Sequence, residues 1–220
     1  MTGLEFEGLT AANFDKFREH ILRSEEAYPE TIRSTSEDFM FMLNDTHAIA
    51  FVALIDAKYV GNVFGSELCG EDMEACKDHI TLGKKTLYVY NLVVDPEYQR
   101  KGYANAMFMK FAEQARGMGF ETIVGHFRHN GSLHIFKKLG GAEKTAFPNW
   151  ENSGEDYVLC ELDLVGAFAQ PQIQPAAKIE TLSPEPAMPV LEPSPQLELP
   201  QPQDVMPFDM GNDMHGMPSV

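Results

Sequence analysis

The sequence predicts a mixed α/β domain, in which helices flank one β-sheet, followed by a disordered C-terminal tail. Apolar residues repeat with strand and helix periods along residues 1–165, in the order β–α–α–β–β–β–α–β–α–β–β. Because this order mixes adjacent strands with strand–helix–strand units, a doubly wound sheet is not expected. The 44% hydrophobic content is enough to build a core, and the composition changes abruptly after about residue 165.

The first part of the domain is predicted to contain a strand, two helices and a β-hairpin. Thr10 is the expected N-cap of the first helix, and residues 34–37 have the pattern of a capping box before the second. The turn at 56–58 separates two apolar strands and predicts the hairpin. The acidic segment 67–78 is expected to be a solvated loop or a frayed helix. These elements are a strand at 4–7, helices at 11–27 and around 39–43, and strands at 47–55 and 59–66.

Residues 87–105, LYVYNLVVDPEYQRKGYAN, are predicted to form the central strand, a tight turn and the start of a helix. The Asp95-Pro96 pair ends the strand, because proline removes a backbone donor. Gly102 then precedes an amphipathic helix at 103–116. A small-residue loop before a helix leaves backbone N–H groups free at the positive end of the helix dipole, which suits a diphosphate. An ordinary strand-to-helix connection is the alternative for a single glycine.

The rest of the domain is predicted to form a strand, a short helix and two final strands. Turn residues at 129–132 follow the strand at 122–127, and Gly140-Gly141 ends the helix that comes next. A polar turn at 149–155 separates the last two strands. The helix spans 133–139, and the two strands span 142–147 and 157–164.

Residues 166–220 differ in composition from the domain at 1–165. Eleven of the 14 prolines lie there, and Lys178 is the only lysine or arginine against seven acidic residues. Such a segment cannot support a packed core, so we expect it to be disordered or locally polyproline II. Two interpretations stay open: a solubilising tail, or a docking motif for a protein partner formed by the apolar residues between 206 and 217.

The charge and cysteine content exclude several classes of protein. A formal net charge of −16 argues against nucleic-acid binding, which needs lysine and arginine to neutralise phosphates. The charge is compatible with a cationic substrate, although many cytosolic proteins are acidic. The chain contains no run of 18 apolar residues, so no membrane span is predicted. The N-terminus does not resemble a signal peptide. Three scattered cysteines indicate reduced thiols in the cytoplasm, with neither a disulfide framework nor a metal site.

Two motifs together resemble the GNAT superfamily of acetyl-CoA-dependent N-acetyltransferases. The first is Gln99-x-x-Gly102-x-Ala104 after the strand that ends Leu-Val-Val-Asp-Pro, similar to the family's Gln/Arg-x-x-Gly-x-Gly/Ala signature. The second is residues 129–140, HNGSLHIFKKLG, similar to the later segment Asn-x-x-Ala-x-x-Leu-Tyr-x-Lys-x-Gly-Phe. The two motifs and the element order cover roughly residues 4–164. The P-loop and the dinucleotide fingerprint fit poorly, because their lysine and glycine spacings are missing.

The resemblance implies a GNAT-type mixed sheet that is splayed between the central strand and the following parallel strand, with acetyl-CoA bound in the gap as co-substrate. It places residues of the central strand beside the pantetheine and the amides of the following loop on the pyrophosphate. Arg100 and Lys101 add positive charge there, and Gly102 allows close approach. The implied cofactor-binding residues are Leu92, Val93, Val94, Arg100, Lys101, Gly102, Tyr103, Ala104, Asn105 and Asn130.

The catalytic residues depart from the pattern that the resemblance implies. Many family members carry Glu or His on the central strand where this chain has Tyr88 and Tyr90, and the usual acid, a tyrosine, is Phe136 here. Tyr88 and Tyr90 share one strand face and are the candidate catalytic residues, although phenols are poor bases near neutral pH. The other candidate bases are His126, His129, and Glu71 or Asp72 acting through water.

The favoured hypothesis is an enzyme that transfers an acetyl group to a primary amine by direct attack. The acceptor is a small molecule, a peptide N-terminus or a lysine, and a cationic acceptor fits the acidic chain. Homodimers are frequent among GNAT folds. The alternatives are a GNAT-fold module that binds acetyl-CoA with weakened catalysis, and an adaptor protein that works through its C-terminal tail.

Overall fold

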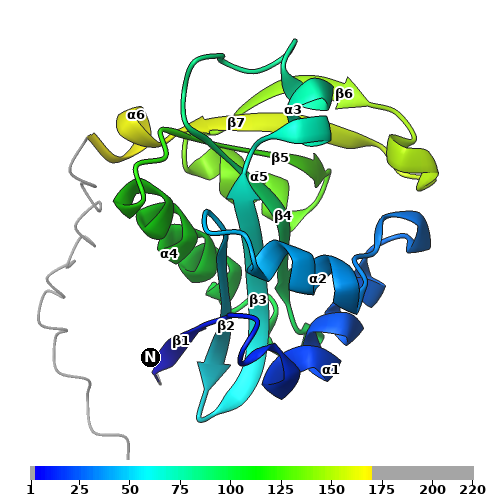
Figure 1. Cartoon of the computed structure of the whole chain (residues 1–220), viewed down its shortest axis with the longest axis vertical. Helices are drawn as coiled ribbons and strands as arrows, with labels where there is room; N and C mark the ends of the chain where they lie inside the picture. The colour runs from blue at the N-terminus through cyan, green and yellow to red at the C-terminus, as the bar shows by residue number, and fades with distance from the viewer. Residues whose placement is uncertain (1–2, 170–220) are drawn as a thin grey trace, which may run out of the picture. The chain divides into compact units, whose positions relative to one another are not determined.

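The computed structural model describes residues 3–169, which form one seven-stranded sheet with helices on both faces (Figure 1). The strand order is β1-β2-β3-β4-β5-β7-β6. Every neighbouring pair is antiparallel except β4 and β5, which run parallel. The strands are β1 (Leu4–Gly8), β2 (Ile49–Ile55), β3 (Lys58–Glu67), β4 (Thr86–Val94), β5 (Thr122–Arg128), β6 (Ala142–Phe147) and β7 (Tyr157–Asp163). The predicted mixed α/β class is therefore confirmed.

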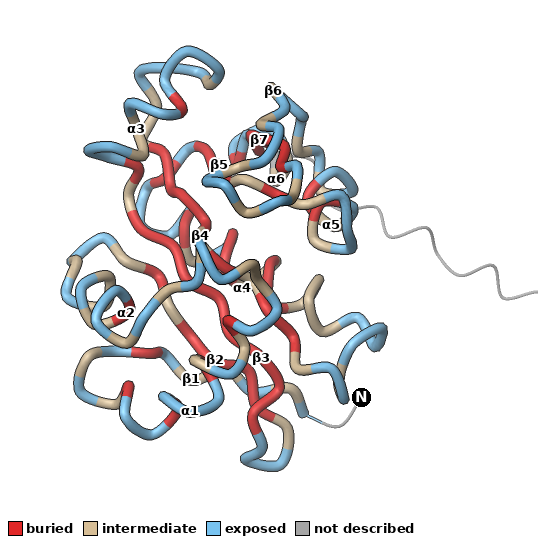
Figure 2. The backbone as a smooth tube through the Cα atoms, turned by 90° about the vertical axis from the view of Figure 1, so that its right-hand side faces the viewer, coloured by how far each residue is buried: buried red, intermediate tan, exposed pale blue. Residues whose placement is uncertain are grey.

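The helices divide between the two faces of the sheet. The α-helices are α1 (Phe14–Ser24), α2 (Ser36–Leu43), α3 (Gly70–Cys76), α4 (Tyr103–Gly117), α5 (Gly131–Lys138) and α6 (Leu164–Ala169). Four single turns of 3-10 helix are η1 (Glu25–Ala27), η2 (Glu30–Ile32), η3 (Pro96–Tyr98) and η4 (Trp150–Asn152). Side chains of α4 and α5 belong to one core cluster, whereas those of α1 and α2 belong to another on the opposite face. Buried residues concentrate along the central strands between these layers (Figure 2).

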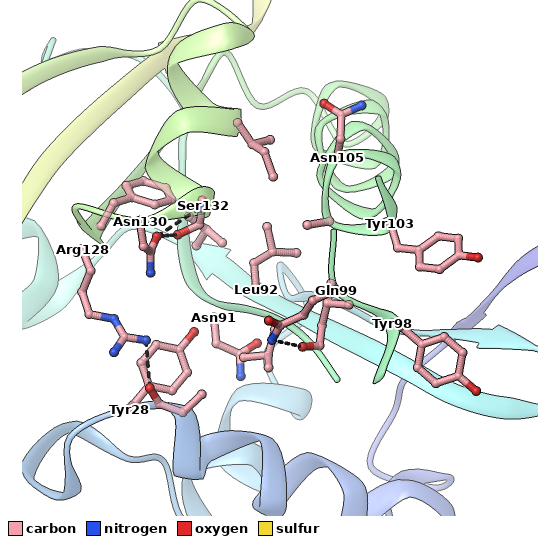
Figure 3. Close-up of a pocket in the computed structure, with 18 of the residues that line it drawn as sticks. Tyr28, Asn91, Leu92, Tyr98, Gln99, Tyr103, Asn105, Arg128, Asn130 and Ser132 are labelled. Carbon is pink, nitrogen blue, oxygen red and sulfur yellow. Dashed lines mark hydrogen bonds between the residues drawn. The ribbon is translucent and has the colours of Figure 1, made fainter. Parts of the chain in front are cut away.

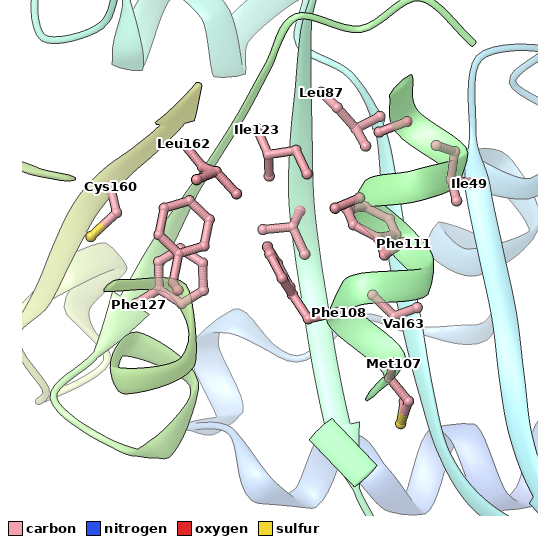
Figure 4. Close-up of a cluster of buried hydrophobic side chains, with 14 of the residues drawn as sticks. Ile49, Val63, Leu87, Met107, Phe108, Phe111, Ile123, Phe127, Cys160 and Leu162 are labelled. Atoms are coloured by element: carbon pink, nitrogen blue, oxygen red, sulfur yellow. The ribbon is translucent and has the colours of Figure 1, made fainter. Parts of the chain in front are cut away.

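Helix α4 supplies the largest part of the main core (Figure 4). Met107, Phe108 and Phe111 are almost fully buried against the strands of the sheet. Burying each such side chain contributes about 1.5–3 kcal/mol to folding. Gly65 on β3 permits the contact, because a Cβ there would lie 2.5 Å from the ring of Phe111.

Two helix starts differ in detail from the sequence prediction. The helix predicted at 11–27 begins at Phe14, since Asn13 is the N-cap residue and its Oδ1 accepts from the Thr10 amide. Its predicted last turn is the 3-10 helix η1. The capping box before α2 joins Thr35 and Asp38, one position later than the predicted pattern at 34–37. The Asp38 carboxylate accepts from the backbone N–H of Thr35, a bond that glutamate makes in the usual capping box.

Two segments are more helical than predicted. Residues 70–76 of the acidic segment form α3, which is held to the sheet by the fully buried Cys76. The last strand ends at Asp163, and the chain continues as α6, so residues 166–169 of the predicted tail are helical. Burial of Leu164 and the bond from its amide to the Glu121 carbonyl (2.9 Å) start this helix. The predicted disorder of the remaining tail lies outside the described residues.

The sheet is splayed between β4 and β5. These strands pair only over Thr86–Tyr88 and Thr122–Val124 and separate beyond that point. A bulge in β4 lies where they separate, because Val89 and Asn91 face consecutive residues of β3 and Tyr90 is the extra residue. Bulges bend a strand and increase its twist, which directs the end of β4 away from β5. The splay that the resemblance implied is thus present.

Candidate active site

A cleft of about 510 Å³ lies where β4 and β5 separate (Figure 3). Its walls come from β4, the loop before α4, the N-terminus of α5, the end of β5, the segment after α1, and the start of β7. Beyond Tyr88 neither parallel strand has the other as a partner, so the backbone edges of β4 and β5 are open to the cleft. The splay of the sheet therefore creates the cleft.

The loop before α4 presents free backbone donors to the cleft. The amides of Tyr103, Ala104 and Asn105 are the first of the helix and have no acceptor one turn earlier. The first turn contains no acidic residue. Gly102 has φ +85°, and a Cβ at this position would meet no atom within 4 Å. Glycine is favoured there by its left-handed backbone rather than by crowding.

The structure brings together nine of the ten residues predicted to bind the cofactor. Lys101 is the exception, since its Nζ donates to the carbonyl of Glu97 (2.9 Å) and lies 5.3 Å from the ring centre of Tyr98. Asn130 is the N-cap of α5, where its Oδ1 accepts from the amide and hydroxyl of Ser132. The residues that line the cleft are Leu92, Val93, Val94, Arg100, Gly102, Tyr103, Ala104, Asn105 and Asn130.

The two predicted catalytic tyrosines have different environments. Their rings lie on one strand face with centres 4.8 Å apart. Tyr90 lines the cleft, and its hydroxyl donates to Oδ2 of Asp72 on α3 (2.8 Å). Tyr88 is buried behind it, and its hydroxyl is hydrogen-bonded to Nδ1 of His126 (2.6 Å). Burial raises the pKa of both phenols, so both stay protonated near neutral pH.

His126 lines the cleft within an aromatic cluster. Its ring stacks on Trp150 with centres 3.8 Å apart and meets Phe147 edge-on. Burial lowers the pKa of His126 to about 4, because an imidazolium would be poorly solvated there. A neutral His126 is therefore a weak base. His129 is exposed on the turn before α5 and does not line the cleft.

Phe136 and Glu71 lie away from the cleft. Phe136 is fully buried in the core between Phe108 and Phe127, with ring centres at 5.5 and 4.6 Å. It has neither a proton to donate nor access to the cleft. Glu71 is exposed on α3, whereas its neighbour Asp72 holds the Tyr90 hydroxyl.

Sequence reasoning missed the residues that form the far wall of the cleft. Arg128, at the end of β5, donates to the Ala27 carbonyl (2.8 Å) and to Glu155 (3.2 Å), and its guanidinium lies over the ring of Tyr28 (Figure 3). It thereby links the segment after α1 to the loop before β7. The contacts join residues about 30 and 100 positions apart, so no local pattern indicates them.

A buried carboxylate lies directly behind this wall. Glu25 is 3% exposed, and its two oxygens accept from the side chain of Asn91 (2.7 Å) and the amide of Ser34 (2.9 Å). Asn91 lines the cleft on the other side. Burial raises the pKa of Glu25, whereas the two hydrogen bonds lower it. Glu25 thus fixes Asn91 and the segment that carries Tyr28.

The lining fits a nucleotide diphosphate joined to a narrow thioester arm. The free amides at the start of α4 and the Arg100 side chain match a pyrophosphate, and the open strand edges match an extended arm. Residues 3–169 contain no group of three His, Cys, Asp or Glu side chains placed to hold a metal ion. None of the helices in this part of the chain is long and apolar enough to span a membrane.

The acetyltransferase (GNAT) family model matches residues 14–140, more than half of the chain, and the chain belongs to this family. No curated protein matches it significantly. The matching solved structures include the ribosomal-protein-S18-alanine N-acetyltransferase from Escherichia coli, at 17% identity and TM-score 0.56, covering 74% of this chain and 94% of that one. Arabidopsis thaliana NAA60 in complex with acetyl-CoA matches at 16% identity and TM-score 0.58, covering 73% and 99%. At such identities the likeness shows the fold alone.

Proposed function

We propose that this protein is an N-acetyltransferase that transfers the acetyl group of acetyl-CoA to a primary amine by direct attack. The observation that carries the proposal is the cleft between β4 and β5, with the free amides of Gly102-Tyr103-Ala104-Asn105 at one end. Membership of the GNAT family supports acetyl transfer in general. The residues that line the cleft come from both faces of the splayed sheet, which would give a donor and an acceptor separate approaches.

The loop before α4 would hold the donor. Arg100 and the amides of residues 102–105 would bind the pyrophosphate, because a helix N-terminus and a guanidinium both favour anions. The open edge of β4 at Leu92, Val93 and Val94 would hold the pantetheine arm. Bound acetyl-CoA supplies an acetyl thioester as the electrophile. Backbone N–H groups on the same edge are the available donors to its carbonyl oxygen.

Tyr90 and Asp72 would remove the proton from the acceptor amine. An alkylammonium has a pKa near ~10 and must lose a proton before it attacks. The proton passes to the Tyr90 oxygen while the Tyr90 hydroxyl proton passes to Asp72, 2.8 Å away, and then to solvent. Tyr90 is neutral before and after this transfer, which agrees with the raised pKa of its phenol. His126 is less suited to this role, because its pKa is lowered to about 4.

Calorimetric titration of acetyl-CoA and of CoA into the full chain tests the donor site first. We expect saturable binding of both ligands. Thiol release in the presence of amines, with mass spectrometry of the acetylated product, then tests transfer. A folded chain that binds neither ligand would contradict the proposal, as would binding without transfer to any primary amine.

A further inference from the structure

The cleft lies in the splay of the sheet, and its lining residues come from both faces. On β5 and β7, Phe127 and Val158 belong to the core cluster beneath α4 and α5. His126 and Tyr157, one residue away in each strand, point to the opposite face. The register pairs His126 with Leu159 and Arg128 with Tyr157, so His126 and Tyr157 are diagonal neighbours on that face. Both line the cleft.

Two polar atoms at this end of the cleft are buried without partners. Within residues 3–169, neither Nε2 of His126 nor the hydroxyl of Tyr157 has a hydrogen bond. Gln114 Oε1 is the third such atom, and its residue does not line the cleft. A buried polar group without a partner costs about 1–3 kcal/mol. Two such groups in one cleft indicate a ligand that supplies the missing partner.

Both atoms are available as donors. The Tyr88 phenol is protonated because burial raises its pKa, and Nδ1 of His126 lies within 2.6 Å of it. We assign the Tyr88 hydroxyl as the donor to Nδ1, which places the proton of the neutral imidazole on Nε2. The hydroxyl of Tyr157 is also protonated, since burial raises its pKa. Two donors match an oxygen acceptor such as a carbonyl.

The charges of the lining disfavour an acceptor with several positive charges. Arg100 and Arg128 line the cleft, and Arg128 is paired with Glu155, which does not line it. The described residues that line the cleft include no Asp or Glu, so a polyamine would find only Asp72, bonded to Tyr90, for its second ammonium. An amine with a carbonyl next to it has one cationic group and provides the oxygen that the two donors lack.

We propose that Tyr157 and His126 bind the carbonyl oxygen adjacent to the reacting amine, so that the acceptor is the α-amino group of a peptide. This inference rests on the proposed N-acetyl transfer and names its substrate class. Tyr157 and His126 bind the acceptor on the face opposite α4, whereas the donor is held by the loop on the α4 side.

The test compares two acceptors, alaninamide and isopropylamine, which share the branched amine but differ in the carbonyl. We expect the wild type to acetylate alaninamide with the higher kcat/KM at matched concentrations of free amine. Tyr157→Phe should raise KM for alaninamide roughly 3- to 10-fold, the cost of one neutral hydrogen bond. It should leave KM for isopropylamine unchanged. Because the hydroxyl has no partner, the variant should unfold at the same denaturant concentration as the wild type or a higher one.

Tyr59→Phe is the matched control. Tyr59 is 7% exposed and Tyr157 4% exposed, but the Tyr59 hydroxyl donates to Asn62 and lies outside the cleft. This variant should lose stability and keep its acceptor preference. A Tyr157→Phe variant that loses stability without a change in KM, or that impairs both acceptors equally, would overturn the inference. So would a wild type that prefers isopropylamine or the side-chain amine of Nα-acetyl-lysine amide.

Failure of the inference is distinguishable from failure of the proposed function. If acetyl-CoA does not bind by calorimetry, N-acetyl transfer itself is wrong and the acceptor assignment falls with it. If acetyl-CoA binds and some amine is acetylated, only the acceptor assignment is tested by Tyr157→Phe.

Discussion

At the residue scale, the carboxylate that the central strand lacks is supplied by α3. The bulge at Tyr90 directs its hydroxyl to Asp72, 18 positions earlier in the chain. The usual tyrosine of the later motif is the core residue Phe136, which packs against Phe108 and Phe127. In the proposed mechanism, Tyr90 occupies the family's position on the central strand, and the carboxylate comes from α3 instead.

Asp72→Asn tests the proton path. The asparagine still accepts the hydrogen bond from Tyr90 but does not take a proton. We expect kcat to fall by on the order of 100-fold near pH 7, the usual contribution of a general base. The loss should shrink as the pH approaches the pKa of the acceptor, because the amine then loses its proton unaided. The affinity for acetyl-CoA should not change.

Glu71→Gln is the control for Asp72→Asn, because Glu71 is an exposed acid on the same helix with no bond to Tyr90. Its pH–rate profile should match that of the wild type. Equal losses in the two variants, or a loss in Asp72→Asn that does not depend on pH, would exclude the path through Tyr90.

The partly buried His126 predicts a pH dependence of stability. Its pKa is about 4 in the folded protein and 6.5 unfolded, so the unfolded chain binds more protons between these values. This contribution is present above pH 6.5 and is lost as the pH falls through the folded pKa. The stability lost by pH 5 amounts to about 2 kcal/mol. Denaturant titrations at pH 7 and 5 should therefore show a smaller pH effect in His126→Phe.

His126→Phe also leaves the Tyr88 hydroxyl without its partner, which lowers stability at both pH values alike. The readout is the difference between pH 7 and pH 5. His134→Gln, a substitution of an exposed histidine on α5, controls for the loss of an imidazole. If His126→Phe showed the same pH effect as the wild type, the His126 ring would have to be solvated in the folded protein.

At the element scale, α4 joins the core to the donor site. Met107, Phe108 and Phe111 fix the helix on the sheet, and this fixes its N-terminus at the cleft. The left-handed Gly102 turns the chain into the helix, and a second left-handed glycine, Gly119, follows its end with φ +80°. The two glycines adopt the same left-handed backbone conformation at opposite ends of one helix.

Gly102→Trp should abolish acetyl-CoA binding while the protein stays folded, because the side chain enters the space where backbone donors face the cleft. The left-handed backbone should cost about 1–2 kcal/mol of stability. Gly119→Trp should cost a similar amount, since nothing lies within 4 Å of its Cβ position either. Calorimetry should show normal acetyl-CoA affinity in Gly119→Trp. Unchanged affinity in Gly102→Trp would mean that the loop does not bind the donor.

At the scale of the whole molecule, all residues that line the cleft fall between Ala27 and Tyr157. The described chain continues beyond this range through β7 into α6. In α6, the partly buried Phe168 packs against the main core and its ring lies 4.9 Å from the Arg116 guanidinium. The end of the described part of the chain therefore affects stability more than it affects the cleft.

Truncation after residue 165 or 169 tests this separation. The shorter fragment lacks the contacts of Phe168, worth about 1 kcal/mol, and should melt about 2–4 °C lower than the longer one. Both fragments should bind acetyl-CoA as the full chain does. Weaker binding by the 1–169 fragment would show that residues 170–220 contribute to the donor site.

The sequence alone determined the order of the seven strands and of four helices, the central strand and the loop before α4, but not α3 and α6, because local periodicity and residues with special backbone preferences specify the former. Strand alternation also predicted that Tyr88 and Tyr90 share one face of this strand, as their ring contact shows. The tertiary structure decided the far wall of the cleft. Arg128 and Tyr157 meet there through strand register, and Asp72 of α3 bonds to Tyr90 at the bulge of β4. Such contacts depend on how distant segments pack, which no local pattern encodes.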